Sequence, residues 1–245
     1  MTKRPLIAVL TGAGISTDSG IPDYRGPNGL WQRDPSARKL VTLGPYLADP
    51  EVRRRAWLMR RDAGAQAAEP NAGHHALVDL ERSGLPVRVL TQNVDGLQQR
   101  AGLPTRKLLE LHGTAREVQC ARCRVVGDMA EALARVEAGE PDPDCRECGG
   151  ILRPRTVMFG EALDPVVLQQ ADAIAKACDL FVAVGTSLQV YPVASLPQIA
   201  LEGGARLVVV NGEPTPFDEA ADEVIREPIS EALPALVRKL IAEHA

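Results

Sequence analysis

The segment Leu6-Ile-Ala-Val-Leu-Thr-Gly-Ala-Gly-Ile-Ser-Thr-Asp-Ser-Gly20 decides the fold class, because it joins an apolar run to a glycine-rich turn. Residues 6–10 have the composition of a buried strand that enters the turn at Thr11-Gly12. Glycines there let the backbone approach a pyrophosphate, and the N-terminus of a following helix would favour its charge. A dehydrogenase fingerprint needs a third glycine where Thr17 stands. The turn indicates a nucleotide site but does not support an ordinary hydride-transfer dehydrogenase.

Further apolar runs alternate with helix-like stretches along the chain. The runs cover residues 87–90, 108–111, 180–184 and 207–210. The helix-like stretches cover residues 72–82, 165–177 and 193–202, and an amphipathic stretch at 229–242 closes the chain. Strands that alternate with helices form parallel sheets with helical crossovers. We therefore predict an α/β fold with a Rossmann-like, doubly wound parallel sheet.

Two segments interrupt this alternation and predict a small lobe. Residues 31–70 are rich in charge and carry one expected helix at about 51–66, whereas residues 115–157 hold four paired cysteines and a polar turn at 140–144. We expect a helical module from the first and a metal module from the second. The large lobe would then comprise about 1–30, 71–114 and 158–245, and the whole chain, 1–245, would be a single catalytic domain.

Length and charge exclude several classes of protein. The chain has 245 residues, is 45% hydrophobic and carries a net charge of −4, with a sequence pI of about 5.7. No positive field is available to neutralise nucleic-acid phosphates, so broad nucleic-acid binding is disfavoured. No stretch approaches the roughly 18 apolar residues of a membrane span, and the N-terminus lacks a signal peptide's apolar core. We expect a cytoplasmic protein, a monomer, without a membrane partner.

The cysteine pattern C-x2-C-x21-C-x2-C is the strongest local signal. Cys120, Cys123, Cys145 and Cys148 can place four thiolates tetrahedrally around one zinc ion, at about 2.3 Å each. The shell would be closed and hence structural, since a catalytic zinc keeps an open position. Free thiols are the alternative, as is a nucleic-acid-binding zinc ribbon with Arg122, Arg124 and Arg146 beside the ligands. The fifth cysteine, Cys178, lies in an apolar run and is expected to be a buried hydrophobe.

Polar residues follow the predicted strands where ligands bind in open α/β sheets, outside the carboxyl ends. Thr91-Gln-Asn-Val-Asp-Gly-Leu97 and Glu110-Leu-His-Gly113 place Gln92, Asn93, Asp95 and His112 there. A histidine at this place can act as a base near neutral pH. Gly185-Thr-Ser187 and Asn211-Gly-Glu213 follow two later strands.

Two further features surround these strand ends. The loop Gly20-Ile-Pro-Asp-Tyr-Arg-Gly-Pro-Asn-Gly-Leu-Trp31 is either a shaped loop over a cofactor or a surface turn. The other histidines, His74, His75 and His244, are expected to be structural or solvated.

Taken in order, GAGIS, GIPDYRG, TQNVDGL, LHG, the four cysteines, MFGE, VGTSLQVYP and VVNGEPTP resemble the sirtuin family across nearly the whole chain. In wording the motifs are closest to class II of that family. The resemblance implies a Rossmann-type large domain, a small lobe of a zinc module and a helical module, and a cleft for NAD and an acyl-lysine peptide. It implies an NAD-dependent protein-lysine deacylase, with His112 and Asn93 catalytic.

The resemblance also assigns binding residues. Those implied to bind NAD are Gly12, Ala13, Gly14, Ser16, Asp23, Tyr24, Arg25, Trp31, Gln92, Asn93, Val94, Asp95, Gly185, Thr186, Ser187, Asn211, Gly212, Glu213 and Ile229. Those implied to contact the substrate are Trp57, Arg60, Val157, Phe159, Gly160, Glu161 and Val190, with 159–161 offering an edge to which the peptide adds as a strand.

The implied reaction releases nicotinamide and transfers the acyl group to ADP-ribose, with His112 taking a proton from the ribose hydroxyls. The zinc takes no part. Members that prefer succinyl or malonyl groups carry Tyr-x-x-Arg where this chain has Trp57-Leu-Met-Arg60, so a short acidic acyl group is disfavoured. Protein mono-ADP-ribosyl transfer, which uses the same NAD cleavage, remains an alternative, as does a non-catalytic NAD-responsive module with a nucleic-acid-binding zinc ribbon.

Overall fold

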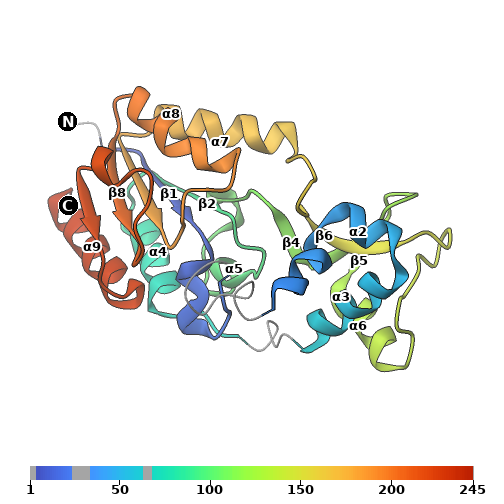
Figure 1. Cartoon of the computed structure of the whole chain (residues 1–245). Helices are drawn as coiled ribbons and strands as arrows, with labels where there is room; N and C mark the ends of the chain where they lie inside the picture. Colours follow the sequence, from blue (N-terminus) through green and yellow to red (C-terminus); the bar gives the residue numbers. More distant parts are fainter. Residues whose placement is uncertain (1–3, 24–33, 63–67, 245) are drawn as a thin grey trace.

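The computed structural model describes residues 4–23, 34–62 and 68–244, which form a large and a small lobe (Figure 1). The large lobe is built on a parallel sheet of six strands in the order β3-β2-β1-β7-β8-β9. These strands are β1 (Ile7–Thr11), β2 (Val87–Thr91), β3 (Leu108–Glu110), β7 (Leu180–Val184), β8 (Arg206–Val210) and β9 (Glu223–Ile225). The predicted α/β fold with a doubly wound parallel sheet is confirmed.

Alternating side chains of the strands enter two separate cores, because successive residues of a strand point to opposite faces. On β1, Ile7 and Val9 pack against α4 (Ala72–Arg82) and α9 (Ile229–Glu243). Ala8 and Leu10 of the same strand pack instead against α7 (Pro165–Ala177) and α8 (Leu196–Glu202). Figure 1 shows the two helix pairs on opposite sides of the sheet. Covering both faces explains why the strands are apolar throughout.

The remaining elements of the large lobe are short. They are η1 (Ala13–Ser19), α5 (Leu97–Arg100), η3 (Thr105–Lys107), η4 (Val193–Ser195) and η5 (Asp218–Ala220). The expected helix at 193–202 is thus divided into η4 and α8, with Pro197 in the first turn of α8, where a missing N–H costs least.

The small lobe joins the two predicted insertions. Its antiparallel sheet has the order β5-β4-β6, with β4 (Gly113–Cys120), β5 (Val126–Asp128) and β6 (Leu152–Thr156), and α6 (Met129–Glu137) packs on it. The helical insertion forms η2 (Pro35–Val41), α2 (Leu43–Ala48) and α3 (Pro50–Asp62). The helix expected at about 51–66 corresponds to α3, and residues 63–67 lie outside the described residues.

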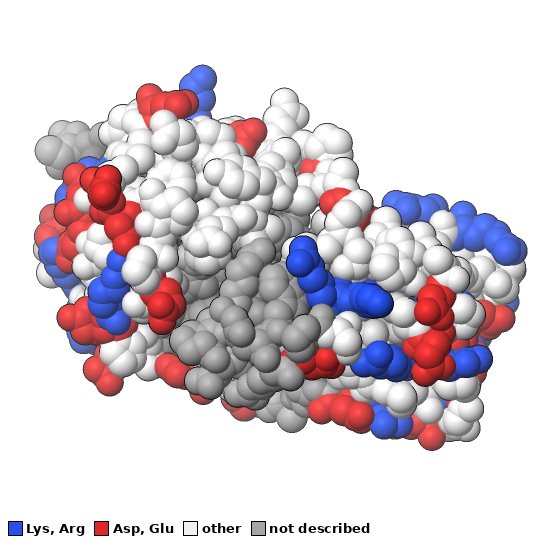
Figure 2. All heavy atoms as spheres, viewed as in Figure 1, with Lys and Arg blue, Asp and Glu red and all other residues white. Residues whose placement is uncertain are grey.

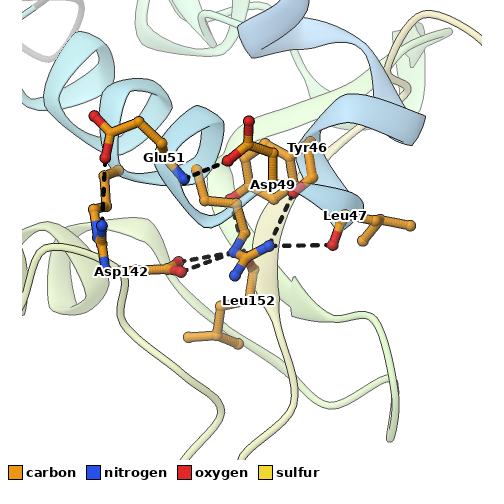
Figure 3. A network of polar contacts seen from close by, with 8 residues as sticks. Tyr46, Leu47, Asp49, Glu51, Asp142 and Leu152 are labelled. Atoms are coloured by element: carbon orange, nitrogen blue, oxygen red, sulfur yellow. Dashed lines mark hydrogen bonds and ion pairs between the residues drawn. The ribbon is translucent and has the colours of Figure 1, made fainter.

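A buried arginine ties these two modules together (Figure 3). Arg53 of α3 donates through Nε to Asp142 Oδ2 at 2.8 Å, across to the loop that precedes the zinc module's second cysteine pair. The same guanidinium donates to the carbonyls of Tyr46 and Leu47. Tyr46 in turn donates its hydroxyl to Leu152 O of β6 at 2.9 Å, and burial raises the pKa of that phenol to about 12. We call these contacts the Arg53 clamp.

The surface seen in Figure 2 mixes both signs of charge. Acidic and basic side chains border one another over the C-terminal part of the large lobe and over the small lobe, and the part of the large lobe drawn above the grey residues is largely uncharged. In the ranges that the structure describes, no helix has both the length and the apolarity to cross a bilayer.

Candidate active site

The glycine turn predicted to bind a nucleotide lies at the switch point of the sheet. Here the loops that follow β1 and β7, which are neighbours, approach each other. Gly14 N–H donates to Gly185 O at 2.9 Å. A Cβ on Gly12 would lie 2.6 Å from Gly185 O, and one on Gly185 would lie 2.5 Å from Ile15 N. Only glycine therefore fits, and the bare backbone forms the floor of a crevice of the kind in which open α/β sheets bind ligands.

Two adjoining cavities open from this crevice. The larger, of about 460 Å³, is lined by the glycine loops and by Asp23, Gln189, Glu213 and Pro214. Of the residues predicted to bind NAD, it brings together Gly12, Ala13, Gly14, Asp23, Gln92, Asn93, Gly185, Thr186, Ser187, Asn211 and Glu213. A phosphate-bearing nucleotide fits this lining, which combines closely approachable glycine backbone with polar side chains.

The smaller cavity, of about 250 Å³, extends toward the small lobe. Its walls are mainly apolar, with Ile21, Val41, Met158 and Leu163. It brings together Ser16, Val94 and Asp95 of the predicted NAD set and Arg60, Val157, Phe159, Gly160, Glu161 and Val190 of the predicted substrate set. Both cavities share Ala13, Gln92, Asn93, His112, Phe159 and Val190, so a ligand in one meets a ligand in the other beside His112.

At that junction Ser16, Asn93 and Asp95 form one hydrogen-bonded group. Ser16 Oγ donates to Asp95 Oδ2 at 2.8 Å and accepts from Asn93 Nδ2 at 3.1 Å. The Asn93 amide also donates to Gly12 O at 3.0 Å, which fixes its orientation. Asn93 is 8% exposed and lines both cavities, so a polar ligand there would meet its carboxamide in a largely desolvated site.

The protonation of the His112 ring follows from its surroundings. His112 Nδ1 lies 3.0 Å from Gln92 O, and because a carbonyl can only accept, Nδ1 carries the proton. The neutral ring then has its lone pair on Nε2, and the residue lines both cavities. Burial lowers the pKa of His112, against the opposing effect of the Gln92 hydrogen bond. The ring is therefore an unprotonated base at neutral pH.

A second histidine lies behind this group. His74, expected to be structural, is completely buried and caps α4: Asn71 N–H donates to its Nδ1 at 3.2 Å. Its proton is then on Nε2, which lies 3.5 Å from Ser16 Oγ. Burial is the main cause that lowers the pKa of His74 to about 4, with Asp95 opposing it. The structural role assigned to His74 fits this position, which also supports Ser16 from behind.

The depressed pKa of His74 predicts a pH dependence of stability. An unfolded histidine binds its proton near pH 6.5, so between pH 6.5 and 4 the unfolded state binds more protons than the folded state. The neutral, buried His74 therefore costs the folded state no stability above pH 6.5. As the pH falls from 6.5 toward 4, the free energy of unfolding decreases by about 3 kcal/mol in total. Denaturant titrations of the wild type and His74→Gln should show a free energy of unfolding that falls more steeply in the wild type over this window. Equal slopes would contradict the prediction.

Some predicted residues lie away from the cavities. Trp57 is fully buried in the small-lobe core and does not line the smaller cavity, so the structure does not bring it to the site. Arg60, one turn later, does line it, with its guanidinium 5.9 Å from the centre of the Tyr46 ring. Ile229 starts α9 and packs on the large-lobe core, and neither it nor Gly212 lines a cavity. Tyr24, Arg25 and Trp31 lie outside the described residues.

The segment predicted to pair with a substrate peptide is already bonded on one side. Phe159 N–H donates to Val41 O at 2.9 Å, and Leu43 N–H donates to Phe159 O at 3.0 Å. The Glu161 carboxylate is held by Arg153 at 2.6 and 2.7 Å. Among the described residues none bonds the backbone groups of Gly160, so these groups are available for pairing with a peptide strand. The peptide edge stays a prediction.

The four paired cysteines converge in the small lobe. Their sulfur atoms all lie within 4.8 Å of one another, with Cys120 Sγ 3.5 Å from Cys148 Sγ and Cys123 Sγ 3.6 Å from Cys145 Sγ. Four thiolates at tetrahedral Zn–S distances of about 2.3 Å would be about 3.8 Å apart, so the donor set fits one zinc ion. A Cβ on Gly150 would lie 2.9 Å from Cys120 Sγ, which explains the glycine there. Cys178 is buried as expected, and burial raises its pKa to about 11.

Sequence reasoning missed a polar layer beneath the site. Gln98 Nε2 donates to Thr11 Oγ1 at 3.1 Å, Thr11 Oγ1 donates to Thr91 Oγ1 at 2.8 Å, and Thr91 Oγ1 accepts from Asn93 N–H at 3.1 Å. These side chains are at most 1% exposed. They hold the ends of β1 and β2 in register and fix the start of the Asn93 loop. The sequence does carry a signal for this layer, because Thr11 and Thr91 are polar residues that each end an apolar strand.

Comparison with known proteins agrees with this geometry. The sequence model described as "Sir2 family" matches residues 12–192, and the chain belongs to that family. It is 69% identical to NAD-dependent protein deacetylase 2 of Streptomyces coelicolor over 98% of this chain and all of that protein. It is 41% identical to NAD-dependent protein deacylase 2 of Archaeoglobus fulgidus over 98% of this chain and 93% of that one.

Solved structures give the same result. A structure described as "Sir2-p53 peptide-NAD+" superimposes with a TM-score of 0.83 at 35% identity, covering 98% of this chain and 94% of the other. The resemblance to the sirtuins is therefore confirmed.

Proposed function

We propose that this chain is an NAD-dependent protein-lysine deacylase, which passes the acyl group of a modified lysine to ADP-ribose and releases nicotinamide. The observation that carries the proposal is that His112, whose Nδ1 is bonded to Gln92 O, lines both the larger cavity and the smaller, mainly apolar one. The close relatives described as NAD-dependent protein deacetylases and deacylases support it.

The larger cavity suits NAD and the smaller one an acyl-lysine. Bound NAD would supply an electrophilic ribose carbon with nicotinamide as the leaving group. The Gly12 and Gly185 loops, whose glycines let a ligand approach the backbone closely, would receive the pyrophosphate, while Asn93 and Asp95, already fixed through Ser16, would orient the nicotinamide end. The apolar walls at Val41 and Met158 would hold the acyl chain and exclude water.

His112 would act as the general base. Its Nδ1–H is committed to Gln92 O, so only Nε2 can take a proton, and that nitrogen lies where a ribose hydroxyl and an acyl group would meet. The zinc ion that the cysteines would hold lies in the other module, behind a closed shell of four thiolates. Its role would be to fold the small lobe and not to assist proton transfer.

Mass spectrometry of NAD incubated with the protein and a panel of acetyl-, butyryl-, succinyl- and longer acyl-lysine peptides tests this proposal. We expect O-acyl-ADP-ribose and nicotinamide in equal amounts, with succinyl removed more slowly than acetyl, because Trp57 offers no phenol to the acyl cavity. Nicotinamide release with the label ending on protein would instead indicate ADP-ribosyl transfer. NAD that survives intact with every peptide would contradict the proposal.

A further inference from the structure

The rim of the NAD cavity on the β8 side is an exposed loop that needs an external support. Asn211, Glu213 and Pro214 of this loop line the larger cavity. Residues 212–214 are all exposed, so no core packing holds them. In the sheet order, β8 lies on the other side of β1 from β2 and β3, which carry Asn93 and His112. The loop can therefore affect nucleotide binding without touching the reacting groups.

Arg226, which directly follows β9, holds this loop from outside the cavity. Its Nη1 donates to Asn211 O at 2.6 Å and to Glu213 O at 3.0 Å. Its Nη2 donates to Asp218 Oδ2. Asp218 also accepts from Thr215, at 2.7 Å from Oγ1 and 3.2 Å from N–H. One guanidinium thus connects both ends of loop 211–218, and we call these contacts the Arg226 clasp.

The chemistry of the clasp is specific to arginine. A planar guanidinium has five N–H donors in a fixed fork, so it can serve two carbonyls and a carboxylate together, whereas a lysine ammonium is a single flexible point. Burial works to raise the pKa of Asp218, but hydrogen bonds from Thr215 and Arg226 outweigh it and hold that pKa below its ordinary value. The partner of Arg226 is therefore a carboxylate, which makes the hydrogen bond charge-assisted.

We propose that Arg226 is a positioning residue that keeps loop 211–218 in its nucleotide-binding shape and thereby sets the affinity for NAD, leaving the rate of acyl transfer unchanged. The inference rests on the proposed use of NAD. When only a fraction of the molecules has the loop in its binding shape, the apparent Kd for NAD equals the intrinsic Kd divided by that fraction. Loss of the Arg226 contacts lowers this fraction and therefore raises the apparent Kd. Arg226 lines neither cavity, so it acts through the loop and touches no bound group.

Lys239 provides a matched control in the same region of the fold. Its ammonium pairs with Glu223 of β9 at 3.1 Å, and the two side chains are 53% and 36% exposed. The Arg226 and Asp218 side chains are 37% and 24% exposed. Both pairs lie beside β9, but only Arg226 bonds the loop that lines the cavity. An exposed ion pair of the Lys239 type contributes little to stability, so its removal should be silent.

The test compares Arg226→Gln, Arg226→Lys, Asp218→Asn and Lys239→Gln with the wild type, by calorimetry with NAD and with ADP-ribose and by steady-state kinetics on an acetyl-lysine peptide. Arg226→Gln should raise the KM for NAD and the Kd for ADP-ribose by about tenfold, the effect of one charge-assisted hydrogen bond. Its kcat and its KM for the peptide should stay within about twofold of the wild type. Arg226→Lys and Asp218→Asn should give intermediate values, and Lys239→Gln should match the wild type.

Other results would overturn the inference. Unchanged affinity for both nucleotides in Arg226→Gln would show that the loop keeps its shape without the clasp. A fall in kcat with unchanged KM for NAD, or an equal effect of Lys239→Gln, would assign Arg226 a general structural role. A wild type that binds neither nucleotide would refute the proposed function, and the inference with it, before any variant is compared.

Discussion

Replacement of His112 by alanine is expected to lower kcat/KM for deacylation by about 10²- to 10⁴-fold, the usual contribution of a positioned general base. Among the described residues His112 is the titratable side chain that lines both cavities, and its bond to the Gln92 carbonyl selects the Nδ1–H tautomer, in which Nε2 can accept a proton. Alanine removes this nitrogen without disturbing the Ser16–Asn93–Asp95 group. The variant should therefore still bind NAD.

The measurement is turnover of an acetyl-lysine peptide, with NAD binding followed by calorimetry. His75→Ala is the control, because His75 is an exposed histidine outside the site and should keep full activity. Since burial lowers the pKa of His112 below 6.5, the acid limb of the wild-type kcat/KM profile should also lie below pH 6.5. Full turnover by His112→Ala would exclude this residue as the base.

Replacement of Cys145 by alanine is expected to abolish zinc binding and to unfold the small lobe. Cys145 is 3% exposed and belongs to a closed group of four sulfur atoms, which leaves three ligands when it is lost. Zinc binding by such sites contributes about 10 kcal/mol or more to folding, an amount comparable to the whole stability of a domain. Deacylation should be lost along with the acyl cavity, although the metal takes no part in the reaction.

Metal analysis and thermal unfolding measure this effect. The wild type should contain one zinc per chain, and Cys145→Ala should contain none and show a low-temperature transition for the small lobe. Cys178→Ala is the matched control, since Cys178 is a buried thiol of the large lobe with no place in the cluster, and it should keep its zinc. A wild type free of zinc would contradict the assignment of the cysteines.

Much of the fold can be predicted from the sequence because the sheet is buried on both faces. The predicted strand at 180–184 and helices at 72–82 and 165–177 match β7, α4 and α7 residue for residue. β9 was missed because it has three residues, begins with Glu223 and has too short an apolar run to detect. α2 and α6, in the insertions, were missed as well; α6 is stabilised by a core that forms only when the small lobe is assembled.

Site residues that directly follow strands could be predicted from the sequence, whereas residues placed by the packing of helices could not. Asn93, Asp95 and His112 follow strands of one parallel sheet, so their convergence follows from topology. Trp57 was expected at the acyl cavity because Trp57-Leu-Met-Arg60 stands where some members of the family carry Tyr-x-x-Arg, but the helix turns its indole into the core. The contact between His74 and Ser16 depends on how α4 packs, which no local pattern encodes.

The Arg53 clamp connects the cysteine module to α3, the helix that contributes Arg60 to the wall of the acyl cavity. α3 carries Arg60 to the cavity, and Arg53 on the same helix is bonded to Asp142 between the two cysteine pairs. Displacement of the metal module would therefore be transmitted along α3 to the substrate. The position of Arg60 at the cavity wall therefore depends on the fold of the cysteine module, although none of the four cysteines lines the cavity.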